Sequence, residues 1–239
     1  MKDGIYNGSV PYDKIDRLRN STLVPFLQTG SVQHALTPKK QSWQMSQGIA
    51  LHEYFLESVV SGKHQEVAEA IDESLKSSYS TAKTIIDNSI HEQIILWTHK
   101  STGLKCKAKI DCTLPSLNMI ADLKFTTGSA EPEGWMNRAC NAGYMPECQV
   151  GFYIIAINQI GDIEYTRFCW IVIETKEPYG VSVIEAPQDV IYAGKSVANH
   201  GIEKWVEAQR KGEQGYPDRV VQASFPSWYW QKLDKKGLI

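Results

Sequence analysis

Two aspartates and one lysine stand out in the stretch "KAKIDCTLPSLNMIADLKFTT" (107–127), which otherwise has the composition of β-strands. Asp111 and Asp122 are eleven positions apart, and Lys124 follows the second aspartate by two. Strands are depleted in aspartate, because its side chain competes for backbone hydrogen bonds and is costly to bury. These three residues are therefore the first candidates for a functional site.

The three side chains suit metal-assisted phosphodiester hydrolysis. Two carboxylates in one cleft repel each other unless a cation lies between them, and oxygen ligands favour Mg²⁺ or Mn²⁺ over softer metals. Such an ion activates water and neutralises charge on a phosphorus centre, and a nearby lysine stabilises the same charge. The residues alone leave two alternatives open. One is a solvated strand face of Asp111 and Lys109, with Asp122 and Lys105 as a surface pair, and the other is a calcium-type structural site.

Alternating apolar and polar residues predict strands at "EQIILWTHK" (92–100), "GLKCKAKIDCTL" (103–114) and "MIADLKFT" (119–126). In the second segment, one face is expected to hold Leu104, Cys106, Ala108, Ile110 and Cys112, and the other Lys105, Lys107, Lys109, Asp111 and Thr113. In the third, Asp122 and Lys124 lie opposite an apolar face. Both aspartates and Lys124 are thus predicted on one side of a sheet whose other side is core.

A helix is predicted over "SWQMSQGIALHEYFLESVVSG" (42–62). Its buried stripe is expected to consist of Met45, Ile49, Leu56 and Val60. That stripe would bring His52 to the inward side. A single inward histidine is usually a hydrogen-bonded core residue, but opposite two strand-borne carboxylates a neutral imidazole is better explained as a metal ligand.

A second helix of interest is predicted at "MPECQVGFYIIAINQIG" (145–161), with proline in its first turn and Gly161 past its end. Gln149 and Tyr153 lie four residues apart and share one face of it. A tyrosine on such a helix commonly packs in the core with its hydroxyl at the rim. Gln149 is harder to explain as packing, because it interrupts an otherwise apolar surface.

The order of elements predicts an α/β (α+β) fold, in which helices flank a central mixed sheet. Further helices are expected at 64–88 and 131–144, further strands at 162–174 and 179–186, and a long helix from Pro187 to about Lys211. We expect one domain over 1–239. It comprises a helical N-terminal part (1–90), a sheet core with the active site (91–186), and a C-terminal helix and tail (187–239).

Composition narrows the possible partners and the compartment. The net charge of the 239-residue chain is -2, so any contact with DNA requires a local basic patch rather than the whole surface. The five cysteines include no C-x-x-C pair, which argues against a structural zinc site and favours a reducing, cytoplasmic setting. No apolar run approaches the roughly 18 residues that cross a bilayer, and the N-terminus lacks a signal-peptide pattern, so no membrane association is expected.

Four segments together resemble the RecB/RecE branch of the PD-(D/E)xK nucleases: "GIALHEYFLES", "KAKIDC", "ADLKFTT" and "GYMPECQVGFY". In that branch a helix His, a strand Asp, an Asp-x-Lys and a Gln-x-x-x-Tyr helix follow in this order. The resemblance covers about residues 10–157. It includes "YDKIDRLRNSTLVPFLQTGSVQHAL" (12–36), which is similar to the lead-in of RecE-type phage exonucleases.

The resemblance implies a restriction-endonuclease-like core and roles for particular residues. It implies two Mg²⁺ or Mn²⁺ ions, held by His52, Asp111, Asp122 and the Leu123 carbonyl, with Lys124 as the catalytic lysine. Gln149 and Tyr153 are expected to contact the DNA backbone. Lys105 and Lys107 are further candidates for binding DNA phosphates, with a plain solvated strand face as the equal alternative.

Two departures from the pattern are visible. Many RecB-like nucleases carry an iron–sulfur cluster held by one cysteine before the His motif and three near the C-terminus. Here no cysteine precedes Cys106 and none follows Cys169, so no such cluster is expected. No phosphate-binding G-x-x-x-x-G-K-[ST] loop is present, so no ATP-driven motor is expected in this chain. The loop "TTGSAEPEGW" (126–135) is more acidic than a DNA channel would suggest.

The resemblance implies an exonuclease that degrades one strand of linear duplex DNA from the 5′ end and leaves a 3′ single strand. It also implies a phage or prophage source, a ring-shaped homo-oligomer and a single-strand annealing protein as partner in recombination. The alternatives are a structure-specific or sequence-specific endonuclease, or an inactive DNA-binding or assembly subunit on the same fold. Trp228, Tyr229 and Trp230 suggest either a stacking platform for bases or, more simply, packing or a subunit interface.

Overall fold

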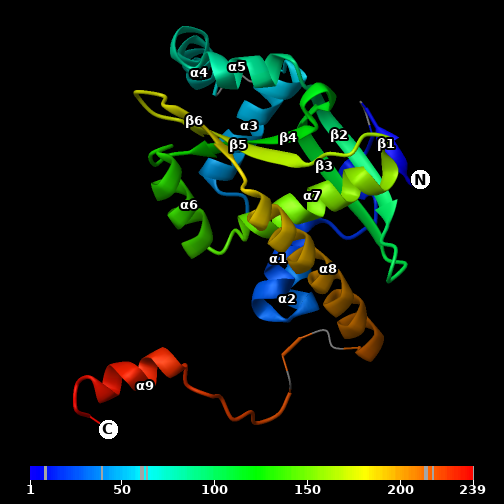
Figure 1. Cartoon of the computed structure of the whole chain (residues 1–239), viewed down its shortest axis with the longest axis vertical. Coiled ribbons are helices and arrows are strands. Elements are labelled where there is room, and N and C mark those ends of the chain that lie inside the picture. The colour runs from blue at the N-terminus through cyan, green and yellow to red at the C-terminus, as the bar shows by residue number, and fades with distance from the viewer. Residues whose placement is uncertain are drawn as a thin grey trace.

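A six-stranded mixed sheet forms the centre of the fold, with its strands side by side in sequence order (Figure 1). The computed structural model describes residues 1–7, 10–38, 40–59, 62, 64–212, 215–216 and 218–238. The strands are β1 (Gly4–Tyr6), β2 (Ile90–Thr98), β3 (Lys105–Leu114), β4 (Met119–Thr126), β5 (Arg167–Glu174) and β6 (Val181–Glu185). β4 and β5 are parallel and the other neighbours antiparallel. A parallel pair needs a long crossover, which two helices provide here.

Helices cover both faces of this sheet (Figure 1). They are α1 (Asn20–Thr29), α2 (Val32–Leu36), α3 (Trp43–Glu57), α4 (Gln65–Ser78), α5 (Ser80–Asp87), α6 (Pro132–Asn141), α7 (Pro146–Ile160), α8 (Gln188–Lys211) and α9 (Ser227–Asp234). α1, α7 and α8 pack on one face, and α3, α4 and α5 on the other, so that two hydrophobic clusters sandwich the sheet. The predicted α/β class is confirmed. The N-terminal segment also adds β1 to the sheet, which the sequence pattern does not indicate.

The buried face of β3 changes at Asp111. Cys106, Ala108 and Ile110 belong to the cluster under α7, whereas Cys112 and Leu114 belong to the cluster under α3. The prediction that all even-numbered residues of β3 share one face is therefore wrong.

An irregularity in the neighbouring strand β2 lies opposite this change. Glu92 has a φ of 54°, and the β2–β3 ladder skips the pair formed by Glu92 and Asp111. The irregularity thus coincides with the first aspartate, and strand irregularities are common near functional sites.

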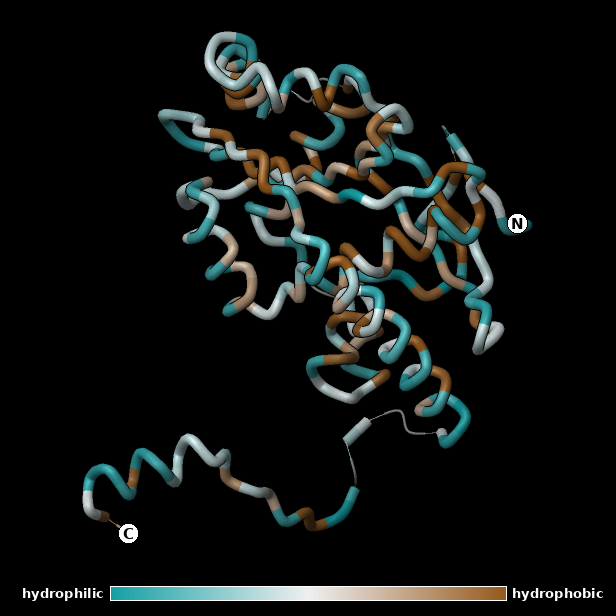
Figure 2. The backbone as a smooth tube through the Cα atoms, viewed as in Figure 1, coloured by the Kyte–Doolittle hydropathy of each residue, from teal (hydrophilic) through white to brown (hydrophobic). Residues whose placement is uncertain are grey.

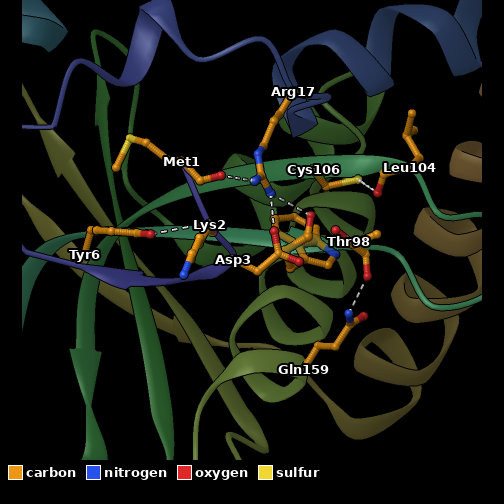
Figure 3. Close-up of polar contacts among 10 residues, drawn as sticks. Met1, Lys2, Asp3, Tyr6, Arg17, Thr98, Leu104, Cys106 and Gln159 are labelled. Carbon is orange, nitrogen blue, oxygen red and sulfur yellow. Dashed lines mark hydrogen bonds and ion pairs between the residues drawn. The ribbon is translucent and has the colours of Figure 1, made fainter.

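An N-terminal segment pairs with the edge of β3 that β4 leaves free. The Leu18 N–H donates to the Lys105 carbonyl at 3.0 Å, and the Lys107 N–H donates to the Leu18 carbonyl at 2.8 Å. Arg17 anchors this segment by donating to Asp3 Oδ1 at 2.6 Å and to the Met1 carbonyl at 2.9 Å (Figure 3). The chain before α1 thus occupies the edge of β3 at Cys106, where β4 does not pair with it.

Helix α7 is held at a fixed depth between the sheet and α8. A Cβ atom on Gly151 would lie 2.0 Å from the backbone of Gly194 in α8, so only glycine permits this approach. The helix therefore reaches the sheet with little freedom to shift. This sets the position of the polar residues that α7 directs towards β4.

The C-terminal residues lie apart from the main body. Hydrophobic stretches gather in the sheet and in α7, and beyond α8 the chain extends away from them to α9 (Figure 2). Near the end of α8, Tyr216 still contacts His34 of α2, with ring centroids 5.5 Å apart. Farther along, Phe225, Trp228, Tyr229 and Trp230 contact one another. Within the described residues, no helix is both long and apolar enough to cross a bilayer.

Candidate active site

The two aspartates face each other where β3 and β4 separate. The strands pair only over Cys112–Leu114 and Met119–Ala121, and the next opposed residues are Asp111 and Asp122. There the Leu123 N–H donates to Asp111 Oδ2 at 2.8 Å rather than to a backbone carbonyl of β3. The eleven-residue spacing is thus the register of one hairpin, and it places both carboxyl groups in the fork between its strands.

Asp122 lies at the centre of a polar group formed by β4 and α7. Its side chain is 3% exposed and forms an ion pair with Lys124, two residues along the same strand. From α7, Gln149 Nε2 donates to Asp122 Oδ1 at 2.8 Å. Asp122 is thus not in a surface pair with Lys105, and that alternative is excluded.

Burial and mutual charge shift the ionisation of these groups. Burial raises the pKa of Asp122 to about 6. The positive charge of Lys124 opposes this shift, and the negative charge of Asp111 adds to it. Burial also raises the pKa of Asp111. Burial alone would lower the pKa of Lys124, but attraction by Asp122 and Asp111 raises it above the ordinary value. Two buried carboxyl groups therefore share one ammonium group, which leaves excess negative charge when both are ionised.

His52 approaches the same fork from α3. Its Nδ1 lies 3.6 Å from Asp111 Oδ2, and its ring packs edge-on against Phe125 with centroids 5.2 Å apart. Burial lowers the pKa of His52 to about 4. The imidazole is therefore neutral near pH 7 and keeps a lone pair for a metal ion.

The predicted buried stripe of α3 needs correction. Met45 and Ile49 are exposed, at 46% and 48% of their surface, and Val60 lies outside the described residues. The residues that α3 buries are Gln47, Ala50, Leu51 and Leu56. The helix has apolar residues on two sides, so its 3–4 spacing does not determine which side meets the sheet. His52 reaches the site from beside Leu51 rather than along the expected stripe.

Glu92 is a site residue that the sequence analysis missed. One carboxylate oxygen of Glu92, one nitrogen of His52 and one oxygen of Asp111 lie within 4.8 Å of one another. The Glu92 side chain is 14% exposed and forms an ion pair with Lys109. Its signal in the sequence is an acidic residue at the start of the apolar run "EQIILW". The missing information was the register that sets it opposite Asp111.

Tyr153 lies one turn after Gln149 on α7. It is partly buried and packs against Phe168, with ring centroids 6.5 Å apart. Burial raises its pKa well above the ordinary value, and the charges of Asp122 and Asp111 act in the same direction. The hydroxyl therefore stays protonated and is available as a hydrogen-bond donor.

The two lysines predicted to bind DNA phosphates lie elsewhere. Lys107 is 3% exposed, and its Nζ donates to the carbonyls of Tyr12 at 2.7 Å and Ile15 at 2.8 Å. This ammonium group holds the N-terminal segment in place, so the structure contradicts the predicted phosphate contact by Lys107. Lys105 is exposed at the start of β3. It stands six residues before Asp111, about 20 Å away along an extended strand.

The donor set of the fork fits a divalent cation. His52, Glu92 and Asp111 bring an imidazole nitrogen and carboxylate oxygens together, and Asp122 adds a second buried carboxyl group. Oxygen-rich sets with one imidazole suit Mg²⁺ or Mn²⁺, and a cation would offset the excess negative charge. These four side chains are the ones that would hold it. Leu123 reaches the site through its N–H, and a role for its carbonyl stays a prediction.

A mixed sheet whose hairpin fork carries Asp, Asp-x-Lys and a helix-borne His defines the PD-(D/E)xK class of fold. Residues 21–219 match the family described as "PDDEXK-like domain of unknown function (DUF3799)". The chain belongs to this family, and the predicted PD-(D/E)xK fold is confirmed. The family description assigns no activity.

Solved structures extend the likeness in fold. A protein of Eubacterium rectale provisionally named an exonuclease superposes with a TM-score of 0.66 at 13% identity, covering 97% of this chain and 99% of its own. A phage-related exonuclease of Haemophilus somnus gives 0.38 at 11% identity, covering 82% and 96%. The first likeness shows a shared fold, and the second is too distant to support an argument. A search of curated proteins found no match.

Proposed function

We propose that this protein is a metal-dependent deoxyribonuclease that degrades linear duplex DNA, of the RecE type. The observation that supports this most is the convergence of His52, Asp111, Asp122, Lys124 and Gln149 on one fork. They come from α3, β3, β4 and α7, in the order that the resemblance to the RecB/RecE branch requires. Each has the chemistry that hydrolysis of a phosphodiester needs at that position.

A bound Mg²⁺ or Mn²⁺ supplies Lewis-acid stabilisation of the phosphate and a water molecule of lowered pKa. The protein's own part is to hold the ligands and to place a positive charge. Gln149 Nε2 donates a hydrogen bond to Asp122 Oδ1, and the Leu123 N–H donates one to Asp111 Oδ2. These two bonds fix both carboxylates before substrate arrives. Lys124 keeps its proton beside Asp122, so its ammonium group is ready to stabilise charge that develops on a phosphate oxygen.

The finer features of this proposal rest on the resemblance. They are degradation from the 5′ end that leaves a 3′ single strand, a ring-shaped homo-oligomer and a single-strand annealing partner. DNA-backbone contacts by Gln149 and Tyr153 belong to the same set. A closed ring would give a chain without a motor a means to remain on one DNA molecule.

Digestion of end-labelled linear duplex in Mg²⁺ tests the proposal. We expect loss of the 5′ label first, no activity in chelator, and no cutting of covalently closed circles. Equal cutting of circles would favour the endonuclease alternative. Binding of DNA without any cleavage in Mg²⁺ or Mn²⁺ would favour the inactive-subunit alternative.

A further inference from the structure

A cavity of about 370 Å³ opens beside Lys124 and Gln149, and its other lining residues have no role in the chemistry described above. Four aromatic side chains from β4, α6, β5 and the turn before α7 line it: Phe125, Trp135, Tyr144 and Trp170. The rings of Trp135 and Trp170 are tilted, with centroids 6.0 Å apart. Tyr144 is 69% exposed, so one aromatic ring remains open to a ligand.

Two of the lining residues also carry a buried polar atom that has no partner among the described residues. Trp170, which is 1% exposed, has a buried Nε1 donor that no described residue accepts from. Asn20, at the start of α1, has a buried Oδ1 acceptor that is likewise unbonded within the described chain. Buried polar groups are normally paired, and unpaired ones call for an explanation. The aromatic rings of the lining suit the flat faces of a heterocyclic base.

The charge of the cavity argues in the same direction. Among the side chains that line it, Lys124 is the only charged one. A second phosphate group would find no further cation there to offset the loss of its hydration, whereas a neutral ring gives up little hydration free energy when it enters. The cavity also shares Lys124 and Gln149 with the fork, so a group attached to the phosphate at Lys124 is within reach.

We propose that this cavity binds the nucleobase of the nucleotide next to the scissile phosphate. The inference rests on the proposed deoxyribonuclease function and adds a subsite to it. To enter, the base must leave its partner in the duplex, which is easiest at a frayed end. Because every base has a π-face, stacking tolerates any sequence. The subsite thus fits an enzyme that removes successive nucleotides regardless of identity.

Abasic substrates and one exposed residue test this inference. The Kd for linear duplex is measured by fluorescence anisotropy in Ca²⁺, with the terminal two nucleotides of the degraded strand either intact or replaced by tetrahydrofuran residues. We expect wild type to bind the abasic end about 5- to 150-fold more weakly, the range given by loss of one stacked base. Tyr144→Ala should weaken binding of the intact end and leave the abasic end unchanged.

Tyr192→Ala is the matched control, because Tyr192 is 77% exposed on α8 and lies outside the cavity lining. It should bind both ends as wild type does. Equal affinity of wild type for both ends, or equal weakening of both by Tyr144→Ala, overturns the base subsite alone. Failure of wild type to cleave any DNA in Mg²⁺ or Mn²⁺ overturns the proposed function, and the subsite with it.

Discussion

At the residue scale, Asp122 contributes a pH dependence to the stability of the metal-free protein. Its pKa is about 6 in the folded protein and 3.8 ordinarily, so between these values the folded state holds a proton that the unfolded state has released. Stability from this group therefore falls as pH rises from about 4 to 6, and is constant above. We expect the free energy of unfolding of wild type, minus that of Asp122→Asn, to fall by about 1–3 kcal/mol over this range.

Urea unfolding in chelator at pH 4, 5, 6 and 7 measures this difference. Subtracting the Asp122→Asn values removes the contribution of titrating groups that do not interact with Asp122. A difference that stays flat, or that grows with pH, would show that Asp122 is not the buried, proton-retaining carboxyl group described above.

Glu92 is expected to contribute to metal binding. Glu92→Gln removes a carboxylate that lies with His52 and Asp111, so Mn²⁺ affinity should fall by about 10- to 100-fold, the range seen for residues around metal ligands. Titration of Mn²⁺ followed by electron paramagnetic resonance measures it directly.

Glu57→Gln is the matched control for this change. Glu57 forms an ion pair with the same Lys109, at 3.1 Å, but is outside the three-residue cluster. Its substitution should leave Mn²⁺ affinity within about twofold of wild type. Equal effects of the two substitutions would show that Mn²⁺ affinity falls because Lys109 loses an ion pair, and not because a metal ligand is lost.

At the element scale, the sequence patterns predicted which elements form the site better than they predicted the directions of individual side chains. The order of the four motifs pointed to α3, β3, β4 and α7 as the elements of the site. The two strand motifs meet because the register of one short hairpin sets Asp111 opposite Asp122. Alternation failed on β3, where the face changes opposite Glu92, a residue of another strand with an irregular backbone. It also failed for Lys107, whose partners are carbonyls about 90 residues earlier in the chain. Such long-range contacts leave no local pattern to read.

Contact between α7 and α8 is expected to position Gln149. Gly151→Ala would place a methyl group 2.0 Å from the Gly194 backbone, so the helices must separate. We expect a loss of about 1–3 kcal/mol in the free energy of unfolding, as for other overpacked contacts. Chemical denaturation measures it.

Gly48→Ala in α3 serves as the control, because nothing lies within 4 Å of the added Cβ. That variant should be about 0.5–1 kcal/mol more stable, since alanine favours helix. A Gly151→Ala protein as stable as wild type would mean that the α7–α8 contact does not fix the depth of α7.

At the scale of the whole molecule, the fold class followed from element order, but the position of the C-terminal segment did not. Residues 220–238 are exposed almost throughout, and their aromatic side chains contact one another rather than the main body. The family match also ends at Arg219. Aromatic density alone does not distinguish a buried segment from an exposed one, which is why the sequence left both interpretations open.

Removal of residues 220–239 should therefore leave the main body intact. Because this segment buries little against the rest of the chain, we expect the free energy of unfolding to change by less than about 0.5 kcal/mol. Urea denaturation of the truncated and full-length chains makes the comparison. A loss of several kcal/mol would show that the tail packs on the body or on another subunit.

The most direct test of the central claim is release of nucleotides from linear duplex DNA by wild type and Asp122→Asn in Mg²⁺. Circular dichroism confirms that both proteins are folded. If the fork between β3 and β4 is a metal-dependent nuclease site, wild type releases nucleotides until chelator is added, and Asp122→Asn releases none. Equal release by both proteins, or none by wild type with either Mg²⁺ or Mn²⁺, would contradict it.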